Sequence, residues 1–114
     1  MHFQIIEDPY FKLIPEKITL FVPGFDNPFD LEDNPYLHLG ALFNFLLEHS
    51  QNEDLLNQTS AFLNEALSTG GSKTEDAIVQ QIFEPSFDYP HFTEKWPKLL
   101  KGRASDLFLE YLPQ

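Results

Sequence analysis

The sequence from residue 35 to residue 68 reads PYLHLGALFNFLLEHSQNEDLLNQTSAFLNEALS and predicts two consecutive helices. In the first, at about 35–49, apolar side chains cover nearly the whole circumference, which is typical of a buried central helix. In the second, at about 53–68, they form a single stripe, which is typical of a surface helix with one buried face. We therefore expect a core centred on Leu42, Phe45, Leu46, Phe62 and Leu63.

Short-range signals mark the ends of both helices. Asn34 precedes Pro35, and an asparagine cap followed by proline at the first helical position is a common helix start. Ser50-x-x-Glu53 has the form of a capping box for the second helix, with Asn52 as an alternative cap. The pair Gly70-Gly71 follows the second helix and supplies a stop signal.

Three further helical segments are expected toward the C-terminus. Ser72-x-x-Glu75 is a second capping box, and it predicts a helix over 74–84 that Pro85 ends. Residues 85–90 then read as a loop. Residues 91–100 are expected to be helical in two pieces, because the residue before Pro97 is pushed toward an extended conformation. The spacing of apolar residues over 104–112 predicts a terminal amphipathic helix, capped near Gly102 or Ser105.

The first 35 residues are expected to form an irregular arm, because five prolines interrupt any long helix there. Asp8 and Pro9 could cap and open a short helix. The β-prone run 18–22 is expected to be a short strand or an extended packed segment.

With 114 residues, the chain has the length of one domain. The sequence predicts an all-α fold, a compact bundle of about five helices. The single domain, 1–114, would comprise the irregular arm (1–35) and a helical core (35–112).

The charge is unevenly distributed along the chain. Seven Lys and Arg residues face 18 Asp and Glu residues, for a net charge of −11. Residues 18–72 contain eight acids and no Lys or Arg, whereas Lys95, Lys98, Lys101 and Arg103 lie close together. Such a surface would repel nucleic acid and anionic membranes, so we expect neither as a partner. The sequence shows no secretory signal and no apolar run of membrane-spanning length, so we expect a soluble, cytoplasmic protein.

Sequence motifs for metal, cofactor or catalytic sites are absent. There is no Cys, and the four histidines (His2, His38, His49 and His91) lack a metal-binding spacing, so we read them as surface or capping residues. The acids of residues 26–33 do not match a calcium loop. Gly70-Gly71-Ser72-Lys73 follows a helix and lacks the glycine of a phosphate loop. We therefore predict no cofactor, no metal and no catalytic residue.

One stretch of the chain resembles a known group of proteins. An apolar helix is followed by Asn52-Glu53-Asp54-Leu55-Leu56 and by Phe62-Leu63-Asn64-Glu65-Ala66-Leu67. This pattern, over about 37–83, resembles small acidic helical bacterial proteins, some of which are thought to be immunity proteins that neutralise toxins. The resemblance implies a helical fold and carries no catalytic residue.

Two functions follow as hypotheses. The first is a non-catalytic acidic module that binds a basic protein such as a nuclease toxin, whose own surface is basic because it binds phosphate backbones. The second is a small enzyme or ligand-binding domain with a pocket among the helices. For the first, acids would steer a basic partner and aromatic side chains would anchor it. The residues predicted to contact the partner are Asp26, Phe29, Asp30, Glu32, Asp33, Tyr36, Glu53 and Asp54.

Overall fold

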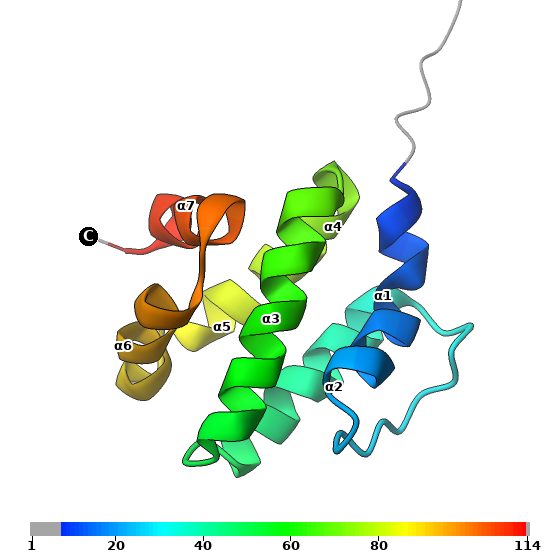
Figure 1. Ribbon diagram of the computed structural model, residues 1–114, viewed down its shortest axis with the longest axis horizontal. Coiled ribbons are helices and arrows are strands. Elements are labelled where there is room, and N and C mark those ends of the chain that lie inside the picture. Colours follow the sequence, from blue (N-terminus) through cyan, green and yellow to red (C-terminus); the bar gives the residue numbers. More distant parts are fainter. Residues whose placement is uncertain (1–7, 114) are drawn as a thin grey trace, which may run out of the picture.

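A computed structural model describes residues 8–113 as a succession of helices. In chain order they are α1 (Pro9–Phe21), α2 (Pro35–Glu48), α3 (Glu53–Thr69), α4 (Ser72–Ile78), the π-helical turn η1 (Val79–Phe83), α5 (Glu84–Ser86), α6 (Pro90–Leu99) and α7 (Gly102–Tyr111) (Figure 1). Within the described range no residue belongs to a strand. The predicted all-α class is therefore confirmed.

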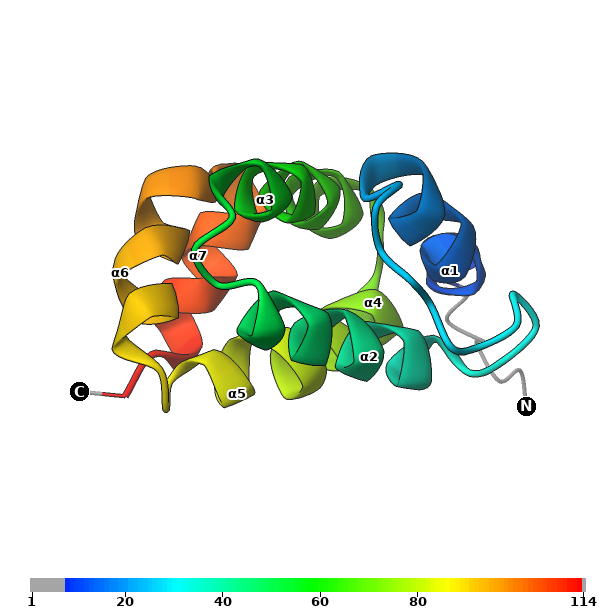
Figure 2. The same cartoon turned by 90° about the horizontal axis from the view of Figure 1, so that it is seen from below.

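The helices form two layers with the core between them. Figure 2 shows α1 and α3 along one side and α2 with α4 and α5 along the other. At one end, α6 and α7 close the gap between the layers, and α7 packs against both α3 and η1. This arrangement places the outer face of α2 at the surface of the molecule, beside the loop that joins α1 to α2.

Most of the predicted core centre is buried as expected. Leu42, Leu46, Phe62 and Leu63 have no solvent-exposed surface. Phe45 is only partly buried, because it lies at the edge of the core, where its ring packs 5.3 Å from that of Phe25 between centroids. The helix 35–49 is therefore central, although Phe45, one of its three predicted core residues, lies at the rim.

The predicted irregular arm contains a 13-residue helix instead, and the predicted strand at 18–22 is wrong. Pro9 does open α1, but the helix continues through Pro15 to Phe21. The reason is tertiary: Tyr10, Ile14 and Ile18 recur every four residues and are buried within the core that α1 shares with α3. The free energy of that burial exceeds the roughly 3 kcal/mol that an internal proline costs.

The caps of the next two helices differ from the predicted capping boxes. Asn52, the alternative cap, starts α3: its side-chain oxygen accepts a hydrogen bond from the amide of Leu55 at 3.1 Å. In α4 the N-cap residue is Gly71, which makes no side-chain capping bond, and Ser72 is already helical. Asp8, 66 residues earlier in the chain, supplies the acceptor instead: its Oδ2 accepts a hydrogen bond from the amide of Thr74 at 2.8 Å.

Two prolines that were expected to break helices lie inside helical segments. Pro85 follows η1, where the amide of Glu84 bonds to the carbonyl of Val79 and widens the turn before the proline. Pro97 lies inside α6, which is one continuous helix because Trp96 is fully buried and its Nε1 donates to Ser86 Oγ at 3.0 Å. The predicted end at Pro85 and the predicted break before Pro97 are both wrong.

The last helix begins slightly earlier than expected. Lys101 occupies the cap position of α7, where Gly102 or Ser105 was predicted. Gly102 has a φ of +55°, in the left-handed region that glycine enters without strain. Arg103 then holds α7 on α4 through a two-pronged ion pair with Glu75, at 2.8 and 3.0 Å.

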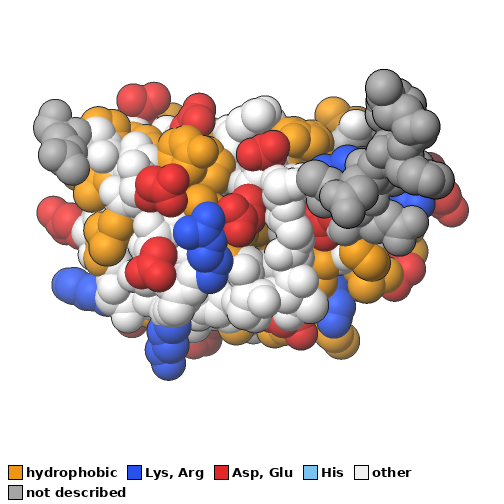
Figure 3. All heavy atoms as spheres, turned by 90° about the horizontal axis from the view of Figure 1, so that it is seen from above, with side chains coloured by type: hydrophobic (Ala, Val, Ile, Leu, Met, Phe, Trp, Pro, Cys, Tyr) orange, Lys and Arg blue, Asp and Glu red, His pale blue; other side chains and the backbone are white. Residues whose placement is uncertain are grey.

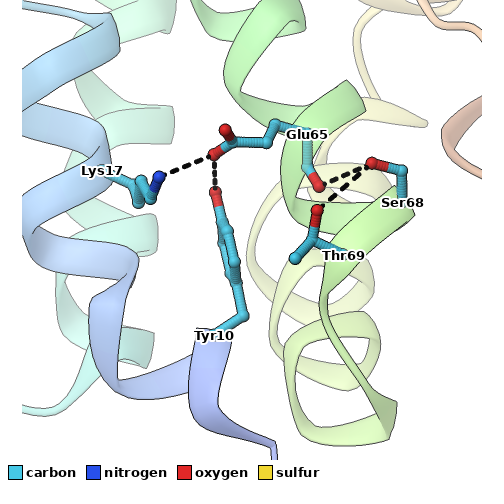
Figure 4. Close-up of polar contacts among 5 residues, drawn as sticks. All are labelled: Tyr10, Lys17, Glu65, Ser68 and Thr69. Atoms are coloured by element: carbon cyan, nitrogen blue, oxygen red, sulfur yellow. Dashed lines mark hydrogen bonds and ion pairs between the residues drawn. The ribbon is translucent and has the colours of Figure 1, made fainter.

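A polar cluster joins α1 to α3 at the surface. The Tyr10 hydroxyl donates to Glu65 Oε2 at 2.7 Å, and Lys17 Nζ lies 3.3 Å from the same oxygen (Figure 4). The Lys17 ammonium also lies 5.8 Å from the centre of the Tyr10 ring. Burial and the neighbouring carboxylate raise the pKa of Tyr10, while the hydrogen bond from Tyr10 and the charge of Lys17 lower the pKa of Glu65.

We expect the fold to lose stability in acid, because the pKa values of two carboxylates, Glu65 and Asp8, are lowered in the folded protein. Burial raises the pKa of Asp8, but hydrogen bonds from the amides of Gly71 and Thr74 outweigh it, so the pKa lies below its ordinary value. Carboxylates with a lowered folded-state pKa stabilise the protein above their unfolded value of about 4. That contribution is lost as the pH falls through the folded-state value.

Denaturant titrations at about pH 7 and about pH 3 would test this, with the double variant Asp8→Asn/Tyr10→Phe as control. Because acid also relieves repulsion among the 18 acids, the informative quantity is the difference between the two proteins. The free energy of unfolding should fall more steeply in the wild type. Equal losses in both proteins would contradict the prediction.

Candidate functional site

The loop between α1 and α2, residues 22–34, carries four of the predicted partner-binding acids, and we call it the acidic loop. A buried histidine, His38 of α2, holds it in place. His38 Nε2 donates to the carbonyl oxygen of Asp30 at 2.8 Å, and its Nδ1 accepts from the side-chain amide of Asn27 at 2.7 Å. The same Asn27 accepts the amide of Phe29 at 3.0 Å, so both histidine nitrogens and the turn are satisfied together.

The expectation that His38 is a surface or capping residue is therefore wrong, since it has no exposed surface. Its role could not be read from the sequence, because the partner atoms lie eight and eleven residues away and one of them is a backbone carbonyl. The ring of Phe29 packs edge-on to that of His38, with 5.9 Å between centroids. His38 and Asn27 thus fix the shape of the acidic loop.

The loop acids differ in exposure. Asp26, Asp30 and Glu32 are exposed, and within residues 8–113 none of them forms an ion pair. Asp33 is partly buried, and its Oδ2 accepts the amide of Asp30 at 2.9 Å. Three loop carboxylates are therefore presented to solvent, while the fourth also closes the turn that carries them.

The two remaining predicted acids lie at the start of α3, away from the centre of the loop. Glu53 is 3.4 Å from Lys95 of α6, so its charge is partly compensated. Asp54 lines a surface hollow of about 310 Å³ together with Gln58 and with Gly24 of the acidic loop. Asp54 therefore borders the start of the acidic loop, whereas Glu53 belongs to a mixed-charge region.

The basic residues near the C-terminus are also partly neutralised. Of the four bases between residues 95 and 103, Lys95 pairs with Glu53 and Arg103 with Glu75. Figure 3, which looks onto the face at the top of Figure 1, shows acidic and basic side chains side by side. Of the eight acids in residues 18–72, Glu53 and Glu65 are thus paired with a lysine, whereas the four acids of the acidic loop form no ion pair within the part of the chain that the structure describes.

A groove follows the outer face of α2 next to the acidic loop. Two open hollows, of about 400 and 330 Å³, share Gly40, Asn44 and Gln81 and so form one continuous depression, which we call the α2 groove. The end nearest the loop is lined by Pro28, Phe29, Tyr36, Leu37 and Ala41. The other end is lined by Phe43, Leu47, Pro85, Asp88 and Tyr89.

Phe29 and Tyr36, the two predicted aromatic anchors, both line the α2 groove. Both are partly buried: Tyr36 packs edge-on to Phe11, with centroids 5.9 Å apart. Two large apolar side chains of the groove are exposed, Leu37 (48%) and Tyr89 (42%), and they lie at opposite ends. Leu37 was not predicted as a site residue, because a leucine on a strongly apolar helix is assigned to the core until the packing partners of that helix are known.

Gly40 lies in the middle of the groove, where its lack of a side chain leaves room for Gln81. A Cβ atom at this position would lie 2.9 Å from Gln81 Oε1, so glycine allows the Gln81 amide to rest against α2. Gln81 belongs to η1, and π-helical turns of this kind are frequent at functional sites. Gln81 and the exposed Asn44 place two side-chain amides in the groove, whose other polar side chains are Asp88 and the hydroxyls of Tyr36 and Tyr89.

The histidines that the structure describes and the Gly70-Gly71 stretch make structural contacts. Within residues 8–113, no three His, Asp or Glu side chains lie close enough together to hold a metal ion. His91 is held by the Ser50 carbonyl at 2.6 Å, His49 packs on Phe45, and His2 lies outside the described residues. The Gly70-Gly71-Ser72 stretch serves as a helix stop and start, with Asp8 in contact where an anion would bind.

Comparison with known proteins adds no assignment: the chain matches no family model, no curated protein and no solved structure. Among the described residues, no helix is both long enough and apolar enough to cross a bilayer. The functional argument therefore depends on the acidic loop and the α2 groove.

Proposed function

We propose that the protein is a non-catalytic binding module that docks a basic protein on the acidic loop. The observation that carries this proposal is the His38 network, which holds Asp26, Asp30 and Glu32 at the surface without intramolecular cations among the described residues. A merely solubilising surface needs charge but does not need a fixed loop. A loop that is already ordered loses little conformational entropy on binding, which favours affinity.

The nature of the partner follows from the charge and from the adjoining apolar residues. Carboxylates attract Lys and Arg side chains and speed the encounter, whereas apolar anchors slow dissociation. A protein that itself binds phosphate backbones presents such a basic surface. A nuclease toxin is a partner of this kind, and it is the one that the resemblance to immunity proteins implies.

Charge reversal in the loop should slow association. In the triple variant Asp26→Lys/Asp30→Lys/Glu32→Lys, which leaves the turn-closing Asp33 in place, we expect the association rate of a basic partner to fall by about tenfold or more at low salt. The difference should shrink as salt screens the field over roughly 8–10 Å. The probe is found by selecting peptides from a displayed random library for binding to the wild-type protein. The most basic of the enriched peptides is then used in the rate measurements.

The matched control reverses three exposed acids elsewhere, Asp76, Glu94 and Asp106, which changes the net charge by the same amount. Association should slow much less in this control than in the loop variant. If both variants slow association equally, net charge alone governs the encounter. That outcome would overturn the proposal. So would a library selection in which Lys and Arg are not enriched among the bound peptides.

A further inference from the structure

The α2 groove has the form of a site for a helix. The groove runs along α2 and is bordered by the acidic loop at one end and by η1 and α5 at the other. α2 packs directly against η1 (Figure 2). The depression between two packed helices is where a third helix fits by ridges-into-grooves packing. Its floor runs from Leu37 to Leu47, ten residues of α2, which is about 15 Å or three helical turns.

The polar content of the groove argues against an extended peptide. An extended chain needs hydrogen-bond partners for its backbone, usually a sheet edge, and residues 8–113 contain no strand. The groove supplies few polar side chains, chiefly Asn44, Gln81 and Asp88. A helix satisfies its own backbone, so it needs only apolar contact along the groove and a few polar contacts beside it.

The charges around the groove select the kind of helix. Asp88 lines one end, the acidic loop adjoins the other, and no Lys or Arg lines either hollow. We infer that the α2 groove binds an amphipathic, Lys- or Arg-bearing helix of the partner protein. Its apolar stripe would lie on Leu37, Ala41 and Leu47, and its basic flanks would face Asp88 and the acidic loop. This inference rests on the proposed function and adds the binding mode.

A peptide titration tests this directly. The probe is a synthetic peptide of about fourteen residues with leucines at helical spacing (i, i+3/i+4, i+7) and lysines on the flanks. Amide NMR signals should shift for residues 37–47 and 81–89, including the side-chain amides of Asn44 and Gln81. A peptide of the same composition, shuffled so that the leucines no longer share a face, should bind at least about tenfold more weakly.

A blocking variant separates the groove from the loop. Gly40→Leu should weaken peptide binding by about tenfold or more, because the new side chain fills the floor of the groove. The fold should survive: the nearest atom to the new Cβ is the end of the flexible Gln81 side chain, and leucine favours helix more than glycine. Ala61→Leu, at an exposed position of α3, is the matched control and should bind like the wild type.

The outcomes distinguish the two proposals. If Gly40→Leu or the shuffled peptide binds as well as the reference while loop charge reversal weakens binding, the helix-in-groove mode is overturned and the proposed function stands. If Gly40→Leu weakens binding but loop charge reversal has no effect, the groove takes an apolar helix without charge selection. That result would overturn both the basic character of the occupant and the proposed function.

Discussion

Replacing Leu46 with alanine should lower the free energy of unfolding by about 2–5 kcal/mol. Leu46 has no exposed surface and lies in the centre of α2, inside the core that both helical layers share. Removing its isobutyl group loses the transfer free energy of the buried carbons and leaves a cavity that close-packed neighbours fill only in part. A loss of this size is a large share of the roughly 5–15 kcal/mol that stabilises a typical domain.

The comparison is with Leu37→Ala, the same change in the same helix at a position 48% exposed. That variant should lose well under about 1 kcal/mol, since little of its side chain leaves the interior of the protein. Denaturant melts with equal slopes for the two variants would allow the midpoints to be compared directly. A loss below about 1 kcal/mol for Leu46→Ala would show that α2 is not central to the core.

The second large effect is expected at Asp8. Asp8→Ala should lower the free energy of unfolding by about 1.5–3 kcal/mol, the usual range for a hydrogen bond to a charged group. The side chain is only 8% exposed, and its Oδ2 accepts the amide of Thr74 in the first turn of α4. Without it, that amide is left buried and unsatisfied, beside a Thr74 hydroxyl that already lacks a partner within the described residues.

The position of the effect distinguishes the tertiary contact from a local one. A cap of α1 would protect amides near Pro9, whereas the contact to Thr74 protects the start of α4, 66 residues along the chain. Hydrogen exchange in Asp8→Ala should therefore accelerate at Thr74 and its neighbours. Asp8→Asn keeps an acceptor oxygen and should lose less. Acceleration confined to the start of α1 would contradict the structure.

Local signals predicted the helices whose boundaries depend on nearby residues. Asn34 and Pro35 start α2, and Asn52 starts α3, because a side-chain cap needs only residues two or three positions away. The apolar patterns of these helices are also visible in the sequence, since helical periodicity shows which side chains share a face. Phe29 and Tyr36, which the sequence predicts as anchors of a partner, both line the α2 groove.

Long-range contacts decided what sequence reasoning missed. Pro15 predicts a break, but burial of Ile14 and Ile18 in the core shared with α3 keeps α1 helical. Gln81 lies in the α2 groove only because η1 packs on α2 at Gly40. No local sequence pattern predicts a contact between two residues that are 41 positions apart in the chain. Burial free energy and packing geometry depend on partners distant in the chain, so propensity alone cannot anticipate them.

The sequence by itself determined the helical class, the helices α2 and α3 and the absence of positive charge between residues 18 and 72. Only the tertiary structure decided which of those acids lie near one another and which are paired. Glu53 is paired with Lys95, whereas His38 holds Asp30 in the acidic loop, where its side chain faces solvent. The physical reason is that charge is a property of each residue, while its compensation, exposure and fixation depend on which side chains the fold places within a few ångströms.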